Sequence, residues 1–383
     1  MSNKTTVGVG MIGYAFMGRV HSQAWRSVGA FFDLPLVPRM AVIAGRSKER
    51  TEAAATQLGW EAAETDWREL VERDDVQIVD ICTPGDSHAE IAIAALEAGK
   101  HVICEKPLAN TVAEAEAMVR AAAAASGKSM VAFNYRRVPA VALARRYVEE
   151  GRLGEIRHVR AQYLQDWIVD PEFPLVWRLQ KDKAGAGALG DIGSHIVDAA
   201  EFITGQHVVG VSGLTETFIK QRPLAGESAG LGASRADSTG EVTVDDAALF
   251  IGRMSGGALA SFEATRFATG RKNAMRIEIN GQLGSLAFDF ESMNELWFSS
   301  GGGGFERILV TEPDHPYVGA WWPPGHGLGY EHTFTHEIKD FLEAIATGAD
   351  PTPSFADGLR VQRVLEAVER SAAEGSRYTN VED

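Results

Sequence analysis

The sequence predicts a doubly wound parallel α/β domain followed by an α+β domain with a large, mostly antiparallel open sheet. Three observations support this prediction. Short apolar runs alternate with helical patterns through the first third of the chain, and a glycine-rich turn follows the first of these runs. After about residue 134, runs with a period of two, separated by short turns, replace that rhythm. The expected domains are therefore residues 1–133 and 134–383.

In the first third, buried parallel strands and covering helices are expected to follow one another along the chain. Gly59 and Gly99 stand where two of the helices would end, as C-terminal glycines often do. The predicted strands are residues 7–12, 40–44, 76–82, 101–104 and 129–133, and the predicted helices are residues 20–28, 48–58, 91–96 and 112–125.

The second domain is expected to open with a helix over residues 140–150, which Gly151 ends. Glycine-containing pairs and runs at 256–257, 280–281 and 301–304 lie where hairpin turns would fall. The predicted strands are residues 158–165, 246–250, 258–263, 276–280 and 285–290, and two late helices are expected at 335–346 and 357–373.

Composition excludes several classes of protein. Hydrophobic residues make up 45% and charged residues 23% of the chain, as in ordinary soluble globular proteins. A net charge of −15 disfavours nucleic acid and anionic membranes as partners, since both attract basic surfaces. The two cysteines, Cys82 and Cys104, form no CxxC pair, which disfavours a disulfide framework or a zinc site. With no secretory pattern in residues 1–6 and no long apolar window, a cytoplasmic location is expected.

Two overlapping glycine patterns lie at the start of the chain. Gly8, Gly10 and Gly13 match G-x-G-x-x-G literally, but the first two lie inside the predicted strand. The second pattern, Gly13-Tyr14-Ala15-Phe16-Met17-Gly18, begins where the strand ends and the helix starts. Free amides and the helix dipole favour a phosphate at that point, so we expect this turn to bind the pyrophosphate of a dinucleotide in a Rossmann domain.

The stretch after the second strand, Gly45-Arg46-Ser47-Lys48, contains no carboxylate for the hydroxyls of an adenosine ribose. Arg46, Ser47 and Lys48 favour the 2′-phosphate of NADP on one interpretation. On the other, Arg46 stacks on adenine and Lys48 is merely solvated. The sequence leaves NAD and NADP both open.

Two polar clusters follow the carboxyl ends of predicted parallel strands, the edge at which open α/β sheets bind ligands. Thr83 and Pro84, with His88 nearby, follow one strand, and Glu105-Lys106-Pro107 follows the next. A lysine held there can stabilise an oxyanion on a substrate. Most lysines are ordinary surface residues. The position of Lys106 at the end of a strand supports a catalytic role, so both interpretations stay open.

A third cluster, residues 190–195, contains Asp191 and His195 at a spacing of four, which places them on one face if a helix begins here. Histidine is suited to take a proton from an alcohol near neutral pH. Asp191 could orient the ring or bind a substrate hydroxyl. The alternative is a helix-capping aspartate with a buried histidine. Two ligands are too few for a metal site.

These motifs, in this order, resemble the Gfo/Idh/MocA oxidoreductases over nearly the whole chain. Pro353-Ser354-Phe355-Ala356-Asp357-Gly358-Leu359 is also typical of them. The resemblance implies a Rossmann domain and a sheet domain with the active site between them, Lys106, Asp191 and His195 as catalytic residues, no metal, and a homotetramer or homodimer. The residues it places at the cofactor are Gly13, Ala15, Phe16, Met17, Gly18, Arg46, Ser47, Thr83, Pro84, His88, Glu105 and Lys106.

Within the family, residues 133–137, 163–167, 177–178 and 187–191 are similar to those of levoglucosan dehydrogenases and related sugar 3-dehydrogenases. That likeness implies NAD and oxidation of a C3 hydroxyl. A polyol pocket also makes physical sense, because polar groups can bond hydroxyls and an aromatic ring can cover the apolar face of a sugar. Core packing or a surface ion pair would explain the same side chains. The expected substrate contacts are Tyr135, Gln165, Trp167, Arg178, Asp191 and His195.

The expected function is therefore an NAD(P)-dependent dehydrogenase that oxidises a secondary hydroxyl of a pyranose or anhydrosugar such as levoglucosan. The alternative substrate is myo- or scyllo-inositol. Two alternatives come from other classes: a non-catalytic sugar or cofactor sensor, which would not need Lys106, Asp191 and His195, and an NAD-dependent glycosidase, which would show no net reduction of the cofactor.

Overall fold

The computed structural model describes residues 4–229 and 232–382, so the first three of the residues considered for a secretory signal lie outside it. The described residues form two compact units. The first contains residues 4–134, Ala229 and Tyr330–Leu359, and the second contains Tyr135–Ser228, Gly232–Gly329 and residues 360–382. No helix in the described part of the chain combines the length and the apolar character needed to cross a membrane.

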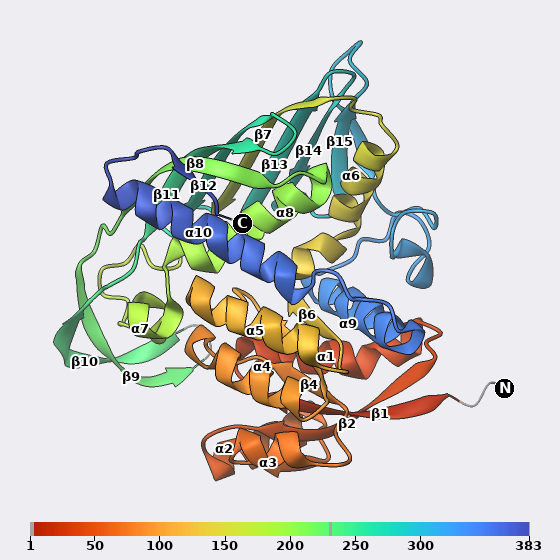
Figure 1. The fold of residues 1–383 in the computed structure, drawn as a ribbon, viewed down its shortest axis with the longest axis vertical. Helices are drawn as coiled ribbons and strands as arrows, with labels where there is room; N and C mark the ends of the chain where they lie inside the picture. The colour runs from red at the N-terminus through yellow and green to blue at the C-terminus, as the bar shows by residue number, and fades with distance from the viewer. Residues whose placement is uncertain (1–3, 230–231, 383) are drawn as a thin grey trace. The chain divides into compact units, whose positions relative to one another are not determined.

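The first unit is built on a parallel sheet in the order β3-β2-β1-β4-β5-β6 (Figure 1). Such an order, with neighbours on both sides of β1, is that of a doubly wound Rossmann sheet. The strands are β1 Thr5–Ile12, β2 Leu36–Ala44, β3 Ala62–Glu64, β4 Ile78–Ile81, β5 His101–Glu105 and β6 Ser129–Ala132.

Helices connect and cover these strands. Gly59 ends α2 in the left-handed conformation, and Thr111 and Glu114 form a capping box at the start of α5. The helices of the first unit are α1 Phe16–Phe31, α2 Lys48–Leu58, α3 Trp67–Glu72, α4 His88–Glu97, α5 Val112–Ala124 and α9 Tyr330–Thr347, with a short 3₁₀ turn at η1 Gly85–Ser87.

The helix α9 belongs to the first unit, although it comes late in the chain. Its apolar face, with Phe334, Ile338 and Phe341, shares one buried cluster with Trp25 and Val28 of α1. Figure 1 shows α9 beside α1. The division predicted from the sequence placed residues 330–359 in the second domain, whereas in the structure they pack with the first unit.

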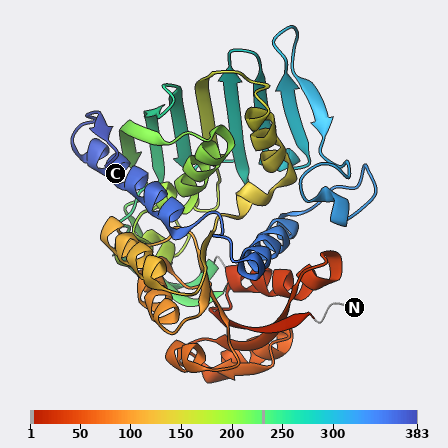
Figure 2. The ribbon, with the colours of Figure 1, turned by 45° about the vertical axis from the view of Figure 1, so that its right-hand side comes forward.

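The second unit is built on a sheet of nine strands in the order β16-β15-β14-β13-β7-β12-β11-β8-β17 (Figure 2). All its neighbours are antiparallel except β7 and β12, which are parallel. The strands are β7 Ile156–Leu164, β8 Val208–Glu216, β11 Ala247–Met254, β12 Leu259–Thr265, β13 Ala274–Gly281, β14 Ser285–Asp289, β15 Glu295–Ser299, β16 Glu306–Leu309 and β17 Thr379–Asn380.

Two further strands, β9 Gln221–Ala229 and β10 Gly232–Glu241, form a separate two-stranded sheet, and Leu224 of β9 also makes an isolated bridge to Leu175. Helix α6 packs against β14 and β15, and α8 packs against β7 and β13. Helix α10 Phe355–Ala373 and the 3₁₀ turn η2 Asn134–Arg137 begin in the first unit and continue into the second. The remaining elements of the second unit are α6 Pro139–Glu149, α7 Lys181–Ala184, α8 Ser194–Thr204, and the 3₁₀ turns η3 Trp177–Leu179, η5 Phe290–Ser292 and η6 Val318–Ala320.

The predicted fold class is confirmed: a parallel doubly wound sheet is followed by a large, mostly antiparallel one. Every strand and helix predicted from the sequence has a counterpart, and α1 begins at Phe16, earlier than the predicted residue 20. The strands and α-helices that the sequence did not predict are β3, α3, α7, β8, β9, β10, β15, β16 and β17, and a helix at α8 was considered only as a condition.

Candidate functional site

In the first unit, the second glycine pattern forms the turn between β1 and α1. Gly13 has a φ of 98°, and a Cβ there would lie 2.7 Å from the Cys82 carbonyl oxygen, so the position requires glycine. A Cβ on Gly18 would lie 2.2 Å from the Gly13 carbonyl oxygen. Ala15 precedes α1, and no side chain caps the first turn of this helix. The turn therefore presents uncapped helix amides at a place where the backbone allows close approach, as a dinucleotide pyrophosphate requires.

Gly8 and Gly10 have a different role. A Cβ on Gly8 would lie 1.8 Å from the Asp75 carbonyl oxygen, and one on Gly10 would lie 2.6 Å from Leu70 Cδ2. Both glycines therefore let neighbouring segments pack closely on β1. Gly8 and Gly10 thus serve the packing of the strand, and the literal G-x-G-x-x-G match that includes them does not mark the phosphate-binding turn.

The stretch after β2 lies beside this turn, since the Gly13 amide donates to the Ala44 carbonyl over 2.9 Å. Arg46 is exposed, and Ser47 precedes α2 without capping it through its side chain. The position that an acidic residue would occupy for ribose recognition thus holds a cationic side chain open to solvent.

Both predicted clusters at strand ends occur on adjacent strands, because β4 and β5 pair directly. His88 joins them: its Nδ1 is 3.1 Å from the Pro107 carbonyl oxygen and its Nε2 is 2.9 Å from the Thr83 carbonyl oxygen. The ring is buried, with 1% of the residue exposed. His88 therefore ties the loop after β4 to the loop that carries Lys106, and both ring nitrogens face backbone carbonyls.

The loop after β5 is also held by the buried carboxylate of Glu105. The Lys106 amide donates to Glu105 Oε2 over 3.1 Å, and Glu105 Oε1 is 2.9 Å from His21 Nε2. Glu105 is 3% exposed, so this carboxylate is a buried support for the loop. Lys106 itself is half-buried.

In the second unit, a π-helical turn, η4 Leu189–Gly193, leads into α8. The Asp245 carboxylate accepts from the Gly187 amide over 2.7 Å and from the Leu189 amide over 2.8 Å, which fixes the start of this turn. The sequence placed Asp191 and His195 on one face on the condition that a helix begins here, and the structure has a π-turn before the helix. Local π-turns of this kind are frequent at functional sites because they re-aim side chains.

Asp191 lies in the π-turn and His195 in the first turn of α8. Asp191 Oδ2 is 3.8 Å from Nη1 of Arg266, a guanidinium whose side chain is fully buried. The Arg266 Nη2 donates to the Asp245 carbonyl over 3.0 Å. A fixed cation thus faces the Asp191 carboxylate, which is itself partly exposed.

His195 is 6% exposed and packs edge-on against Tyr135, with ring centroids 4.5 Å apart. Tyr135 is held in place by its neighbour Arg136, whose guanidinium forms a buried bidentate pair with Asp198: Nε donates to Oδ2 over 2.9 Å and Nη2 donates to Oδ1 over 2.5 Å. The histidine predicted to act as a base therefore lies against an aromatic wall of the sheet domain.

A closed ring of hydrogen bonds adjoins this wall. Asn273 Nδ2 donates to the Tyr135 hydroxyl over 3.3 Å, and the Tyr135 and Tyr163 hydroxyls are 2.5 Å apart. The Tyr163 hydroxyl donates to Asn273 Oδ1 over 2.6 Å. Each hydroxyl can then donate once and accept once. Gln165 Nε2 also donates to Asn273 Oδ1, over 2.8 Å, and Gln165 Oε1 accepts from Trp167 Nε1 over 3.1 Å.

The predicted substrate residues Tyr135, Gln165 and Trp167 are thus joined through one network, with His195 against Tyr135. Arg178 stands apart from this network: its guanidinium lies 4.3 Å from the Trp177 ring, and its carbonyl is 3.5 Å from Arg266 Nη1.

Residues 7–133 match the family model described as "Oxidoreductase family, NAD-binding Rossmann fold", and residues 141–287 match the GFO/IDH/MocA C-terminal domain. The chain belongs to the Gfo/Idh/MocA oxidoreductase family. Both the predicted family and the predicted enzyme class, an oxidoreductase, are therefore confirmed.

Among its relatives is the levoglucosan dehydrogenase of Pseudarthrobacter phenanthrenivorans, 46% identical over 97% of this chain and 97% of that protein. A crystal structure of an oxidoreductase domain protein from Kribbella flavida has 65% identity and a TM-score of 0.95, and covers 99% of this chain and 100% of its own. A levoglucosan dehydrogenase in complex with NADH and levoglucosan has 43% identity and a TM-score of 0.93, with coverage of 99% and 100%.

For this family member, sequence analysis missed three polar residues near the predicted site: Tyr163 as part of the hydrogen-bonded ring, Arg266 beside Asp191, and Asn273 as the hub. Arg266 directly follows β12, and Asn273 directly precedes β13. Their positions as polar residues at strand ends could have marked them as candidates. The local sequence does not show which strand ends lie next to one another in the fold.

One group of side chains with metal-binding atoms occurs in the described residues of this oxidoreductase: His21, Asp80 and Cys82, whose ligand atoms lie within 4.8 Å of one another. They are hydrogen-bonded together, with His21 Nδ1 3.0 Å from Asp80 and Cys82 Sγ donating to Asp80 over 3.4 Å. Burial raises the pKa of the Cys82 thiol, which keeps it protonated. The group is therefore a polar cluster within the core of the Rossmann unit.

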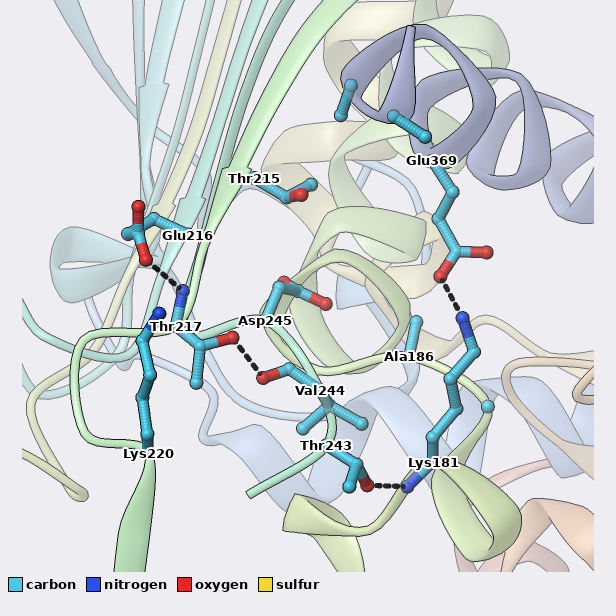
Figure 3. Close-up of a pocket in the computed structure, with 13 residues that line it drawn as sticks. Lys181, Ala186, Thr215, Glu216, Thr217, Lys220, Thr243, Val244, Asp245 and Glu369 are labelled. Carbon is cyan, nitrogen blue, oxygen red and sulfur yellow. Dashed lines mark hydrogen bonds and ion pairs between the residues drawn. The ribbon is translucent and has the colours of Figure 1, made fainter. Parts of the chain in front are cut away.

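A cavity of about 390 Å³ lies in the sheet domain, between the end of β8, the loop before η4 and α10 (Figure 3). Lys181 and Glu369 form an ion pair on its wall at 3.1 Å. None of the predicted site residues lines it. Asp245 does, and its carboxylate also holds the turn that leads to Asp191.

Proposed function

We propose that this protein is an NAD-dependent dehydrogenase that oxidises a secondary hydroxyl, at C3, of a pyranose or anhydrosugar such as levoglucosan. The observation that carries the proposal is 46% identity over 97% of both chains with a relative named levoglucosan dehydrogenase. The polar ring beside His195, with aromatic side chains around it, suits a polyhydroxylated ring. This relationship favours an anhydrosugar over an inositol.

The proposed cofactor site is the turn between β1 and α1 together with the loops after β2, β4 and β5. Support comes from the uncapped start of α1 and from Gly13 and Gly18, where a Cβ would occupy the space that the backbone needs. When bound, NAD supplies the acceptor for the hydride. NAD is favoured because solved relatives contain NADH, whereas the exposed Arg46 supports NADP as the second candidate.

In the proposed reaction, His195 accepts the hydroxyl proton of the sugar as the carbon loses hydride. The ammonium group of Lys106 stabilises the oxyanion that develops on the same oxygen. Asp191, facing the buried Arg266, orients His195 or a substrate hydroxyl. The proposal thus assigns the proton to His195, the electron pair to the new carbonyl and the hydride to the cofactor.

A panel of sugars tests this function. Purified protein is mixed with levoglucosan, glucose, myo-inositol or scyllo-inositol, each with NAD and with NADP, and the near-ultraviolet absorbance of the reduced cofactor is followed. We expect reduction of NAD with levoglucosan, at a higher kcat/KM than with either inositol. Cofactor binding without reduction on any sugar would favour a sensor, and cleavage of a glycoside without net reduction would favour a glycosidase.

We also propose that the protein is a homo-oligomer and that the open face of the large sheet forms the contact. Four large apolar side chains are exposed on this face: Leu214 at 63%, Leu249 at 49%, Ile251 at 63% and Leu259 at 53%. Leu214 and Leu249 are direct cross-strand partners, and Ile251 follows Leu249 on the same face of β11. Exposed apolar side chains gathered on one face of a sheet are typical of protein interfaces.

Light scattering on the purified protein should therefore give the mass of two or four 41.3 kDa chains. Introducing charge into the patch with the double substitution Leu249→Asp and Ile251→Asp should shift this mass toward one chain, because each chain would bring two carboxylates that have to be desolvated in the interface. Val37→Asp, at an exposed position on β2, serves as the control. A single-chain mass for the unchanged protein would refute the proposal.

We further propose the reducing cytoplasm as the location. The support is that Cys82 and Cys104 are both buried thiols with no disulfide between them.

A further inference from the structure

A buried charged network lies beneath the loop that carries Lys106. At its centre is His21 of α1, whose residue is 1% exposed. Its Nδ1 lies 3.0 Å from both carboxylate oxygens of Asp80 on β4, and its Nε2 lies 2.9 Å from Glu105 Oε1 at the end of β5. One imidazole thus bridges two buried carboxylates on neighbouring strands.

Both carboxylates need a partner at this depth. Asp80 is 0% and Glu105 is 3% exposed, and an unpaired buried charge is strongly destabilising. Burial is the largest single effect and opposes protonation of His21, but the charge and hydrogen bond of Asp80, together with contributions from Cys82, outweigh it and hold the pKa of His21 well above its usual value. The protonated ring then donates from both nitrogens, one to each carboxylate.

Asp80 accepts hydrogen bonds from donors besides His21, whereas Glu105 connects His21 to the loop that carries Lys106. Trp25 Nε1 donates to Asp80 Oδ2 over 2.7 Å, and the Phe334 ring of α9 covers His21 with ring centroids 5.3 Å apart. Glu105 uses its second oxygen, Oε2, to accept the Lys106 amide over 3.1 Å. The chain of contacts therefore runs from Asp80 through His21 and Glu105 to the Lys106 backbone.

We propose that His21 is a positioning residue for the dehydrogenase reaction: by clamping Glu105, it fixes the backbone of Lys106 and so aims the lysine side chain at the reacting oxygen. The role rests on the proposed function above. The loop is held on its other side by His88, which contacts the Pro107 carbonyl, so the clamp and this tie together leave the Lys106 backbone little freedom. Misplacing a reacting group by about 1 Å can cost roughly 10²-fold in rate, which is the scale of effect that such a clamp can control.

Hydrogen–deuterium exchange tests the clamp without any assay of activity. In His21→Asn the side chain is too short to bridge both carboxylates, so Glu105 loses its anchor and the Lys106 amide should exchange about tenfold faster or more. Trp25→Phe is the matched control, because it removes a bond to Asp80 from the same helix but leaves His21 and Glu105 joined. Unchanged exchange at Lys106 in His21→Asn would overturn the proposal.

A double-mutant cycle then tests the role in the reaction. His21→Asn should lower kcat about 10- to 100-fold with little change in the Kd of NADH, and Trp25→Phe should leave kcat within a few-fold. In a Lys106→Ala background the same His21 substitution should cost less than about twofold more, because the group that it positions is already absent. Independent losses that multiply would show that His21 acts on the fold at large and would refute positioning through Lys106.

Glu105→Gln gives a second approach if His21→Asn does not fold. The amide keeps an oxygen for the Lys106 amide but loses the charge that binds His21, so exchange at Lys106 should again rise. If the wild-type protein oxidises no sugar in the panel, the proposed function fails on that result alone. The exchange experiment would still decide whether His21 clamps the loop.

Discussion

Replacing Lys106 with alanine is expected to lower kcat by about 10²- to 10³-fold, the usual effect of removing a donor that stabilises a developing oxyanion. Lys106 follows β5, and its backbone is fixed by Glu105 beneath and by His88 through the neighbouring Pro107. The charge that it contributes is therefore aimed in advance, and no other residue of the loop carries a cation. Steady-state kinetics with levoglucosan and NAD measure the loss.

Cofactor affinity separates this role from a structural one. The turn between β1 and α1 does not depend on the Lys106 side chain, so the Kd of NADH, followed by its fluorescence, should change little. Lys106→Arg should restore only part of kcat, because a planar guanidinium replaces a compact ammonium. Lys128→Ala is the control, since the Lys128 ammonium pairs with the exposed Asp350 at the surface. Less than a tenfold loss of kcat in Lys106→Ala would remove this lysine from the reaction.

Much of the first unit could be predicted from the sequence because its signals are local. Buried parallel strands appear as apolar runs, and turn glycines such as Gly59 mark the ends of helices. The position of α9 could not be predicted in this way. Its apolar face shows that it is buried, but Phe334 and Phe341 meet Trp25 of α1 only in three dimensions.

The second unit was harder to predict because its decisive contacts join distant segments. The sequence of β9, Gln221–Ala229, mixes polar and small residues without alternation, and the strand that it pairs with is β10, outside the large sheet. The parallel pairing of β7 with β12 joins strands separated by several other elements. The π-turn before His195 depends on Asp245, a residue far along the chain whose carboxylate holds two amides of the turn.

In the candidate site too, some residues could be predicted from local signals and others only from contacts between distant segments. Lys106, Asp191 and His195 could be singled out because each has a reactive side chain at a strand end or a helix start. Asn273 could not, because its importance lies in its partners: it joins Tyr135, Tyr163 and Gln165 from three separate segments. Residue types with intrinsic reactivity can be predicted from sequence, whereas residues that act through partners require the fold.

His195→Ala is expected to lower kcat by about 10²- to 10⁴-fold, the range that general acid–base catalysis contributes. Its ring packs edge-on against Tyr135, 4.5 Å between centroids, so its orientation is set by a residue that the hydrogen-bonded ring holds in place. Alanine removes the proton acceptor but leaves Lys106 and the cofactor turn unchanged. The Kd of NADH should therefore remain close to that of the unchanged protein.

Chemical rescue distinguishes loss of a base from loss of structure. The substitution leaves a gap the size of an imidazole beside Tyr135, so added imidazole should restore part of kcat in His195→Ala by accepting the proton in place of the side chain. His207→Ala is the matched control, because His207 is half-exposed and its ring pairs with Glu201. It should keep wild-type kcat and show no response to imidazole. A rise in KM with unchanged kcat in His195→Ala would mean that His195 binds the sugar without taking its proton, and the base would then have to be sought elsewhere among the polar groups beside it.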